Sequence, residues 1–245
     1  MKKNMIKRLA TALIVIVLCA ISVCTVLVFN SSADDNIYGG TKKKTFEKTE
    51  AVEELLATAN HFVVVKHKQM GGSHYAYTEA LYEHAGGTDV HYETNFFAGS
   101  QLVILSVLDN GDGTVSTYEK IVKTSTAGVF RDPSVSPDGT KVLYSYKANN
   151  YDDYHIYEQS LTDIKADPVQ LTFGTGRSDT EPQYLANGDI VFSSNRVTQT
   201  VDCWITPVSN LFIMGADGSN IRRVGYDQVH PTYPTVTSDG RVLYT

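Results

Sequence analysis

The sequence predicts an all-β protein in which short antiparallel strands form repeated units. From His61 onward, apolar runs are short, rich in β-branched and aromatic residues, and separated by Gly, Asp and Asn turn residues. A phrase that combines a proline, a turn and an apolar run occurs three times, beginning near Asp132, Glu181 and Tyr233. Long runs with helical periodicity are missing after His61, which favours an all-β domain.

The first 33 residues have the composition of an export signal. Residues 1–8 carry four basic and no acidic residues, residues 9–29 are uncharged and mostly apolar, and residues 31–33 are small. The apolar run is also long enough to span a membrane, so a retained N-terminal anchor is the alternative. Either way we expect an apolar helix over 9–29 and a protein that is periplasmic, extracellular or membrane-anchored.

Residues 34–60 are predicted to hold a linker followed by one short amphipathic helix. The segment 34–44 is polar, contains glycine and ends in three lysines, which is typical of a linker. Thr49 can cap the helix that follows. The helix is indicated by apolar residues at helical spacing, namely Val52, Leu55, Leu56 and Ala59.

The three recurring phrases share their spacing as well as their composition. Aligned on Gly139, Gly188 and Gly240, each has its proline six residues earlier and an Asp or Asn directly before the glycine. An apolar triplet follows each glycine, and two further strand-turn-strand segments, "HIYEQSLTDIKADPVQLTFG" and "NLFIMGADGSNIRRVGYD", complete the unit. We therefore expect equivalent strands at 141–146, 189–194 and 241–245.

A period of about 40–50 residues with four strands in each unit is typical of a β-propeller. One such sheet cannot bury both of its faces alone, whereas blades packed around an axis cover one another. We therefore expect residues 61–245 to form about four blade-lengths of a propeller. Because the chain ends inside an apolar strand, the ring is expected to be incomplete in this chain.

The phrases "SPDGTKVLYS" and "ADGSNIRR" resemble TolB-like propeller repeats. The ordered series from "SHYAY" through "LTFGTGRSDTEPQYLANGDIVFSSNR" to "RVLYT" is similar to the hydrazine synthase alpha-subunit-like family, whose middle domain is a propeller. That resemblance also points to c-type haem, which requires a Cys-x-x-Cys-His site. This sequence has no such motif, and only Cys203 remains after residue 33, so no cofactor is expected.

The negative net charge of the chain limits the classes of partner that it can bind. The net charge of the whole chain is −6, and it falls to about −10 when the four basic residues of the leader are left out. Nucleic-acid binding is not expected from so acidic a domain, because phosphate contacts need basic surface. The partner is then an unidentified protein or small molecule.

Candidate binding residues lie at strand entrances and in loops after strands. In a propeller these segments gather at the ends of the central channel, where ligands usually bind. The candidate residues are Asp132, Glu181, Arg196, Cys203 and His230, together with His74 from "SHYAY". The alternative is structural: the carboxylates and Arg196 form ion pairs between blades, and Cys203 is a small buried residue.

Metal and catalytic sites are not predicted. The segment 108–119 resembles a calcium loop, but its first ligand position falls on Leu108, and a hairpin turn explains its Asn-Gly and Asp-Gly pairs. Four histidines between His67 and His91 lack metal-ligand spacing. Neither a G-x-S-x-G nor an H-E-x-x-H motif is present, so we expect no catalytic residue in this chain.

The sequence therefore predicts an exported propeller module with a ligand-binding, protein-binding or scaffold role. The alternative is the N-terminal part of an enzyme or redox-complex subunit whose catalytic part lies beyond residue 245.

Export has a direct test. N-terminal sequencing of the native protein should give a start near Asp34 if the leader is cleaved, or at Met1 if it is kept as an anchor. Accumulation of the native protein in the cytoplasm would contradict both outcomes.

Overall fold

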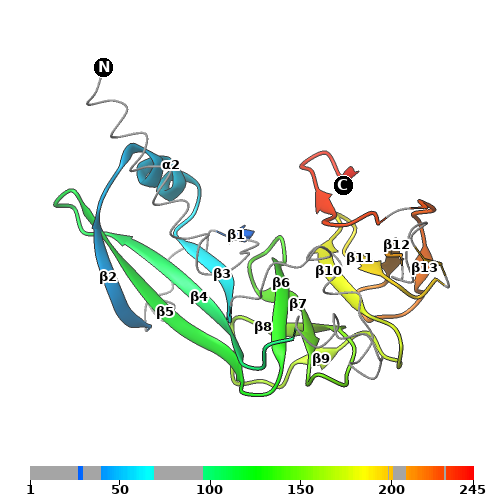
Figure 1. The fold of residues 1–245 in the computed structure, drawn as a ribbon. Coiled ribbons are helices and arrows are strands. Elements are labelled where there is room, and N and C mark those ends of the chain that lie inside the picture. Colours follow the sequence, from blue (N-terminus) through cyan, green and yellow to red (C-terminus); the bar gives the residue numbers. More distant parts are fainter. Residues whose placement is uncertain (1–26, 30–39, 69–95, 198, 201–207, 229) are drawn as a thin grey trace, which may run out of the picture.

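The computed structural model describes residues 27–29, 40–68, 96–197, 199–200, 208–228 and 230–245. Antiparallel strands dominate these segments and form sheets that lie side by side along the molecule, with the N-terminal sheet at one end (Figure 1). This agrees with the predicted all-β class. Most of the predicted apolar helix and the histidines from 74 to 91 lie outside the described residues.

The first sheet has five strands in the order β1-β3-β4-β5-β2. Its strands are β1 (Leu27–Phe29), β2 (Thr41–Glu47), β3 (His61–His67), β4 (Ser100–Asp109) and β5 (Thr114–Ser125).

Two sequence predictions are wrong in this sheet. Residues 27–29, expected to end a helix, form an edge strand that pairs with β3, because Leu-Val-Phe suits a strand once an open edge is available. Residues 41–44, expected to be linker, belong to β2 and pair with β5. The predicted boundary at His61 therefore falls inside the first sheet.

The short amphipathic helix is confirmed as α2 (Glu50–Thr58). Thr49 caps it, since its side-chain oxygen accepts the backbone N–H of Val52. Its apolar side packs on one face of the first sheet, while its glutamates face solvent. In the described residues no helix is long and apolar enough to cross a membrane.

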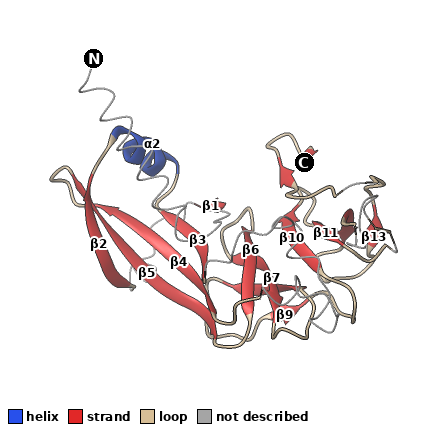
Figure 2. Cartoon of the chain, in the orientation of Figure 1, coloured by secondary structure: helices blue, strands red, loops and turns tan. Residues whose placement is uncertain are grey.

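The second and third sheets repeat one plan. Each has four antiparallel strands in chain order, β6-β7-β8-β9 and β10-β11-β12-β13, and a terminal hairpin β14-β15 follows (Figure 2). The second sheet comprises β6 (Val129–Val135), β7 (Lys141–Lys147), β8 (His155–Ser160) and β9 (Val169–Gln170). The third sheet and the hairpin comprise β10 (Asp179–Tyr184), β11 (Ile190–Ser194), β12 (Asn210–Met214), β13 (Arg222–Arg223), β14 (Thr235–Val236) and β15 (Val242–Leu243).

The three recurring phrases occupy equivalent places, as predicted. In each, the residue two positions after the proline pairs with the first residue of the apolar triplet. These pairs are Val135 with Val142, Tyr184 with Ile190, and Val236 with Val242. The fold is therefore all-β and propeller-like, built of successive similar units.

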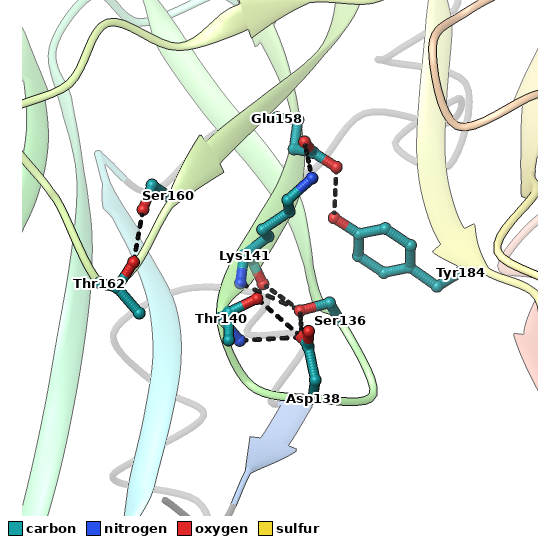
Figure 3. Close-up of polar contacts among 8 residues, drawn as sticks. All are labelled: Ser136, Asp138, Thr140, Lys141, Glu158, Ser160, Thr162 and Tyr184. Carbon is teal, nitrogen blue, oxygen red and sulfur yellow. Dashed lines mark hydrogen bonds and ion pairs between the residues drawn. The ribbon is translucent and has the colours of Figure 1, made fainter.

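The turn inside each phrase is fixed by its aspartate or asparagine and its glycine. In the first phrase, the Asp138 carboxylate accepts the Ser136 hydroxyl at 2.6 Å, and the backbone N–H and hydroxyl of Thr140 at 3.1 and 2.8 Å (Figure 3). These hydrogen bonds, that from Ser136 above all, lower the pKa of Asp138 to about 2. Gly139 follows with a φ of 72°, a left-handed conformation that glycine adopts without strain.

Both faces of the apolar triplet are buried. Val142 and Tyr144 pack towards the first sheet, against Val65 and Leu102. Leu143, between them in sequence, points the opposite way and packs with Ile190 and Phe192 of the third sheet, among others. Strand alternation thus joins three sheets through one strand, β7.

Replacement of Leu143 by alanine tests this packing. Leu143 is fully buried, so Leu143→Ala should lower the free energy of unfolding by about 2–5 kcal/mol in urea titrations. Val169, which is 57% exposed on β9, is the matched control, and Val169→Ala should change stability by less than about 0.5 kcal/mol. Equal effects of the two substitutions would contradict the burial between sheets.

Candidate functional site

The residue before each recurring proline has an unusual backbone. Asp132, Glu181 and Tyr233 have φ values of 50°, 57° and 54°, in the left-handed region that non-glycine residues seldom occupy. At the first two positions the pairing with the next strand shifts in register, which is a β-bulge. The backbone N–H of Glu181, inside its bulge, and that of Tyr233, just before β14, both bond outside their own sheets.

Carboxylates of one unit accept these N–H groups from the next. The Asp132 carboxylate on β6 accepts the backbone N–H of Glu181 on β10 at 3.3 Å. The Glu181 carboxylate in turn accepts the backbone N–H of Tyr233, just before β14, at 2.7 Å. We call this chain of contacts the pre-proline relay. It brings together Asp132 and Glu181, which lie inside β6 and β10 rather than at the strand entrances expected from the sequence.

Glu181 is the most strongly perturbed group of the relay. It is 7% exposed, and its Oε2 accepts the Ser193 hydroxyl at 2.8 Å as well as the Tyr233 N–H. Burial, and then the negative charge of Asp132, raise its pKa to about 7. The two hydrogen bonds and the Arg131 guanidinium act in the opposite direction, but they do not offset burial.

The second sheet has a less complete version of the same arrangement. Ser145 occupies the place that Ser193 holds in the third sheet, yet its buried hydroxyl has no hydrogen-bond partner in the described part of the chain. Asp132 is one methylene shorter than a glutamate, and its carboxylate bonds towards β10. The Nε of Arg131 lies 3.8 Å from the Asp132 carboxylate.

Arg196, which is part-buried, forms an ion pair with the fully buried Asp179 within one sheet. Its guanidinium donates to both carboxylate oxygens of Asp179 at 2.8 Å, and its Nε donates to the Ser194 hydroxyl at 2.9 Å. It also lies over the rings of Phe192 and Phe212. The predicted structural alternative placed Arg196 in an ion pair between blades. That is wrong, because Asp179 and Arg196 lie at the ends of the paired strands β10 and β11.

His230 is placed near the start of β12 rather than in the relay. Its Nδ1 accepts the backbone N–H of Ser209 at 3.1 Å. Burial lowers its pKa, which favours the neutral ring that this acceptor role requires. Cys203 and His74, the other predicted site residues, lie outside the described residues.

Sequence reasoning missed a group of buried polar residues where β7 ends. Lys147 is 5% exposed, and its ammonium lies 5.5 Å from the ring centre of Phe96 and 5.8 Å from that of Tyr154. The Arg131 guanidinium lies over the same Tyr154 ring at 5.7 Å. The available signal was strand alternation, since Leu143 is buried and Lys147, four residues later, lies on the same face.

Asp153, in the connection from β7 to β8, completes this group. Its side chain is buried, and one carboxylate oxygen accepts the Gly176 N–H at 2.7 Å. The other oxygen, Oδ1, has no hydrogen-bond partner in the segments that the structure describes. Lys147 and Asp153 attract each other electrostatically, but no ion pair joins them. We call Lys147, Asp153, Tyr154 and Arg131 the β7-end cluster.

Metal ligation has no support in the described segments. No group of three or more His, Cys, Asp or Glu side chains there is arranged to hold a metal ion.

Comparisons with known proteins give structural neighbours but no family. No family model matches the chain, and no curated protein matches it. Among solved structures, the hydrazine synthase of Kuenenia stuttgartiensis is 15% identical over 60% of this chain and 24% of its own, with a TM-score of 0.45.

Two peptidase structures are also similar. A puromycin hydrolase is 11% identical over 51% of this chain and 20% of its own, with a TM-score of 0.33. A puromycin-hydrolysing peptidase of Mycobacterium tuberculosis is 9% identical over 76% of this chain and 31% of its own, also at 0.33. The chain spans less than a third of the length of these proteins. Because these TM-scores are below 0.5, we infer neither fold nor function from these structures. The propeller-like description of the fold rests on the repeated four-stranded sheets.

A double-mutant cycle distinguishes a structural from a binding role for Arg196. Arg196→Met leaves the Asp179 carboxylate buried without its cation and should destabilise the protein by about 3–5 kcal/mol. Adding Asp179→Leu should recover much of this loss, because no buried charge remains. If Arg196→Met leaves urea unfolding unchanged, the ion pair is not structural and Arg196 is available for a ligand.

Proposed function

We propose that this chain is an exported, propeller-like binding module that takes a small polar ligand at the β7-end cluster. The observation that carries the proposal is a buried cation and a buried carboxylate, Lys147 and Asp153, that attract each other without pairing. The unpartnered Oδ1 of Asp153 lies in the same connection as Tyr154, over whose ring the Lys147 ammonium sits.

The energetics favour an occupant. A buried lysine is rare unless paired, because removing an ammonium from water costs several kcal/mol. The contacts of the Lys147 ammonium with the two aromatic rings stabilise it by only about 0.5–2 kcal/mol. A molecule between Lys147 and Asp153 that accepts from one and donates to the other would satisfy both groups. Burial lowers the pKa of Lys147, and an anionic occupant would raise it again.

The chemistry of the cluster defines the ligand class. A negatively charged group of the ligand, acting as a hydrogen-bond acceptor, suits Lys147 and Arg131. A hydrogen-bond donor of the ligand suits the free oxygen of Asp153, and an apolar part can lie on the Tyr154 ring. An amino acid or the terminus of a peptide has all three features. The simplest competing occupant is a single bridging water, which meets the hydrogen-bonding need alone.

Two further parts of the proposal rest on sequence. The basic and apolar composition of residues 1–33 supports export. The ordered phrases from "SHYAY" to "RVLYT" support a relationship with the hydrazine synthase alpha-subunit-like family, here without a Cys-x-x-Cys-His haem site. We assign this chain a binding or scaffold role and no catalytic residue.

Thermal unfolding in the presence of defined probes tests the ligand class. Glycine, alanine, glutamate and their N-acetylated forms, with inorganic phosphate as a simple anion, should be added at millimolar concentration. The free amino acids should raise the Tm of the unmodified protein, because a ligand of the native state stabilises it. The N-acetyl forms, which lack the cationic donor, should raise it less.

Two variants complete the experiment. Lys147→Met keeps the length of the side chain but removes its charge and should abolish the shift. Lys165→Met changes an exposed lysine of the same sheet region and should leave the shift intact. A shift that survives Lys147→Met, or a protein whose Tm none of the probes alters, would refute the proposed site.

A further inference from the structure

Glu181 contacts three successive units through its backbone and its side chain. Its backbone N–H is bound by Asp132 on β6, its carboxylate accepts the hydroxyl of Ser193 on β11, and the same oxygen accepts the N–H of Tyr233 before β14. It is also one of the three residues with left-handed backbone before a recurring proline. A change of charge on this side chain therefore acts on β6, β10 and β14 together.

We propose that Glu181 is a proton-controlled latch between the units. Its neutral form holds β6, β10 and the terminal hairpin together, and its loss of a proton loosens that junction. This inference concerns the pre-proline relay and is independent of ligand binding at the β7-end cluster.

The two protonation states differ in what the junction must accommodate. In the neutral acid, Oε2 can keep both hydrogen bonds while the other oxygen carries the proton. Ionisation strengthens these two hydrogen bonds, but it buries a second negative charge close to Asp132, and the cost of burial and of repulsion between like charges outweighs that gain. The Arg131 guanidinium, 3.8 Å from Asp132, offsets part of this repulsion.

Within the segments that the structure describes, few charged groups face Glu181. From β6 it faces Asp132 and Arg131, which are the charged groups that act on it. From β11 and β14 it meets a hydroxyl and a backbone N–H, which carry no net charge. On its own strand, Asp179 is neutralised by the guanidinium of Arg196.

The direction of the pH effect follows from burial. The pKa of Glu181 is about 7 in the folded protein, against an ordinary value of 4.5. The unfolded chain therefore releases this proton at lower pH than the folded one. The contribution of Glu181 to stability is complete below pH 4.5, declines as the pH rises from about 4.5 to 7, and stays low above that range.

Hydrogen exchange and urea unfolding between pH 5 and 8 test the latch. In the unmodified protein, the protection factor of the Tyr233 amide should fall by about 10²-fold across this range, and the midpoint of urea unfolding should fall with it. Glu181→Gln mimics the neutral acid and should make both quantities nearly independent of pH. Glu54→Gln removes an exposed carboxylate on α2 and should follow the unmodified protein.

A second variant keeps the test decisive if Glu181→Gln does not fold. Asp132→Asn removes the repelling charge and should move the decline to lower pH, because burial alone then opposes ionisation of Glu181. An unmodified protein without the decline, a Glu181→Gln variant that retains it, or an Asp132→Asn variant that leaves its position unchanged would overturn the proposal.

Discussion

The arrangement of the sheets depends on the burial of β7 on both faces. Val142 and Tyr144 are covered by the first sheet, and Leu143 by the third, so no single sheet has a complete core of its own. An apolar triplet of this kind is unstable in an isolated four-stranded sheet, which would leave one face in water. The units therefore stabilise one another through nearest-neighbour contacts, as in other repeat architectures.

Non-directional apolar packing does not by itself fix how far one sheet slides along the next. The pre-proline relay supplies that alignment, because a carboxylate must meet one particular N–H of the adjoining unit. The backbone conformation that makes this possible is unfavourable for Asp132, Glu181 and Tyr233, and the bulged strands around the first two hold it in place. The alignment of neighbouring sheets therefore requires strained backbone at these three residues.

Much of the fold, but little of the site, could be predicted from the sequence. The Pro-to-Gly spacing located β7, β11 and β15, because local turn chemistry and strand alternation are encoded residue by residue. Pairing partners distant in sequence are not encoded in this way, so the polar composition of residues 41–44 predicts a linker although these residues pair with β5. Likewise, the burial of Lys147 depends on Phe96 and Tyr154, which meet it only in three dimensions.

The helix α2 makes the two faces of the first sheet different. The helix covers the face of the first sheet opposite to the one that meets β7, through residues such as Leu55 and Leu56 against Phe62 and Val64. Among the described residues, α2 occupies this face, where a further sheet would otherwise pack. The first sheet is therefore covered by a helix on one face and by the second sheet on the other. A ring closed through the helix-covered face would have to displace α2 first.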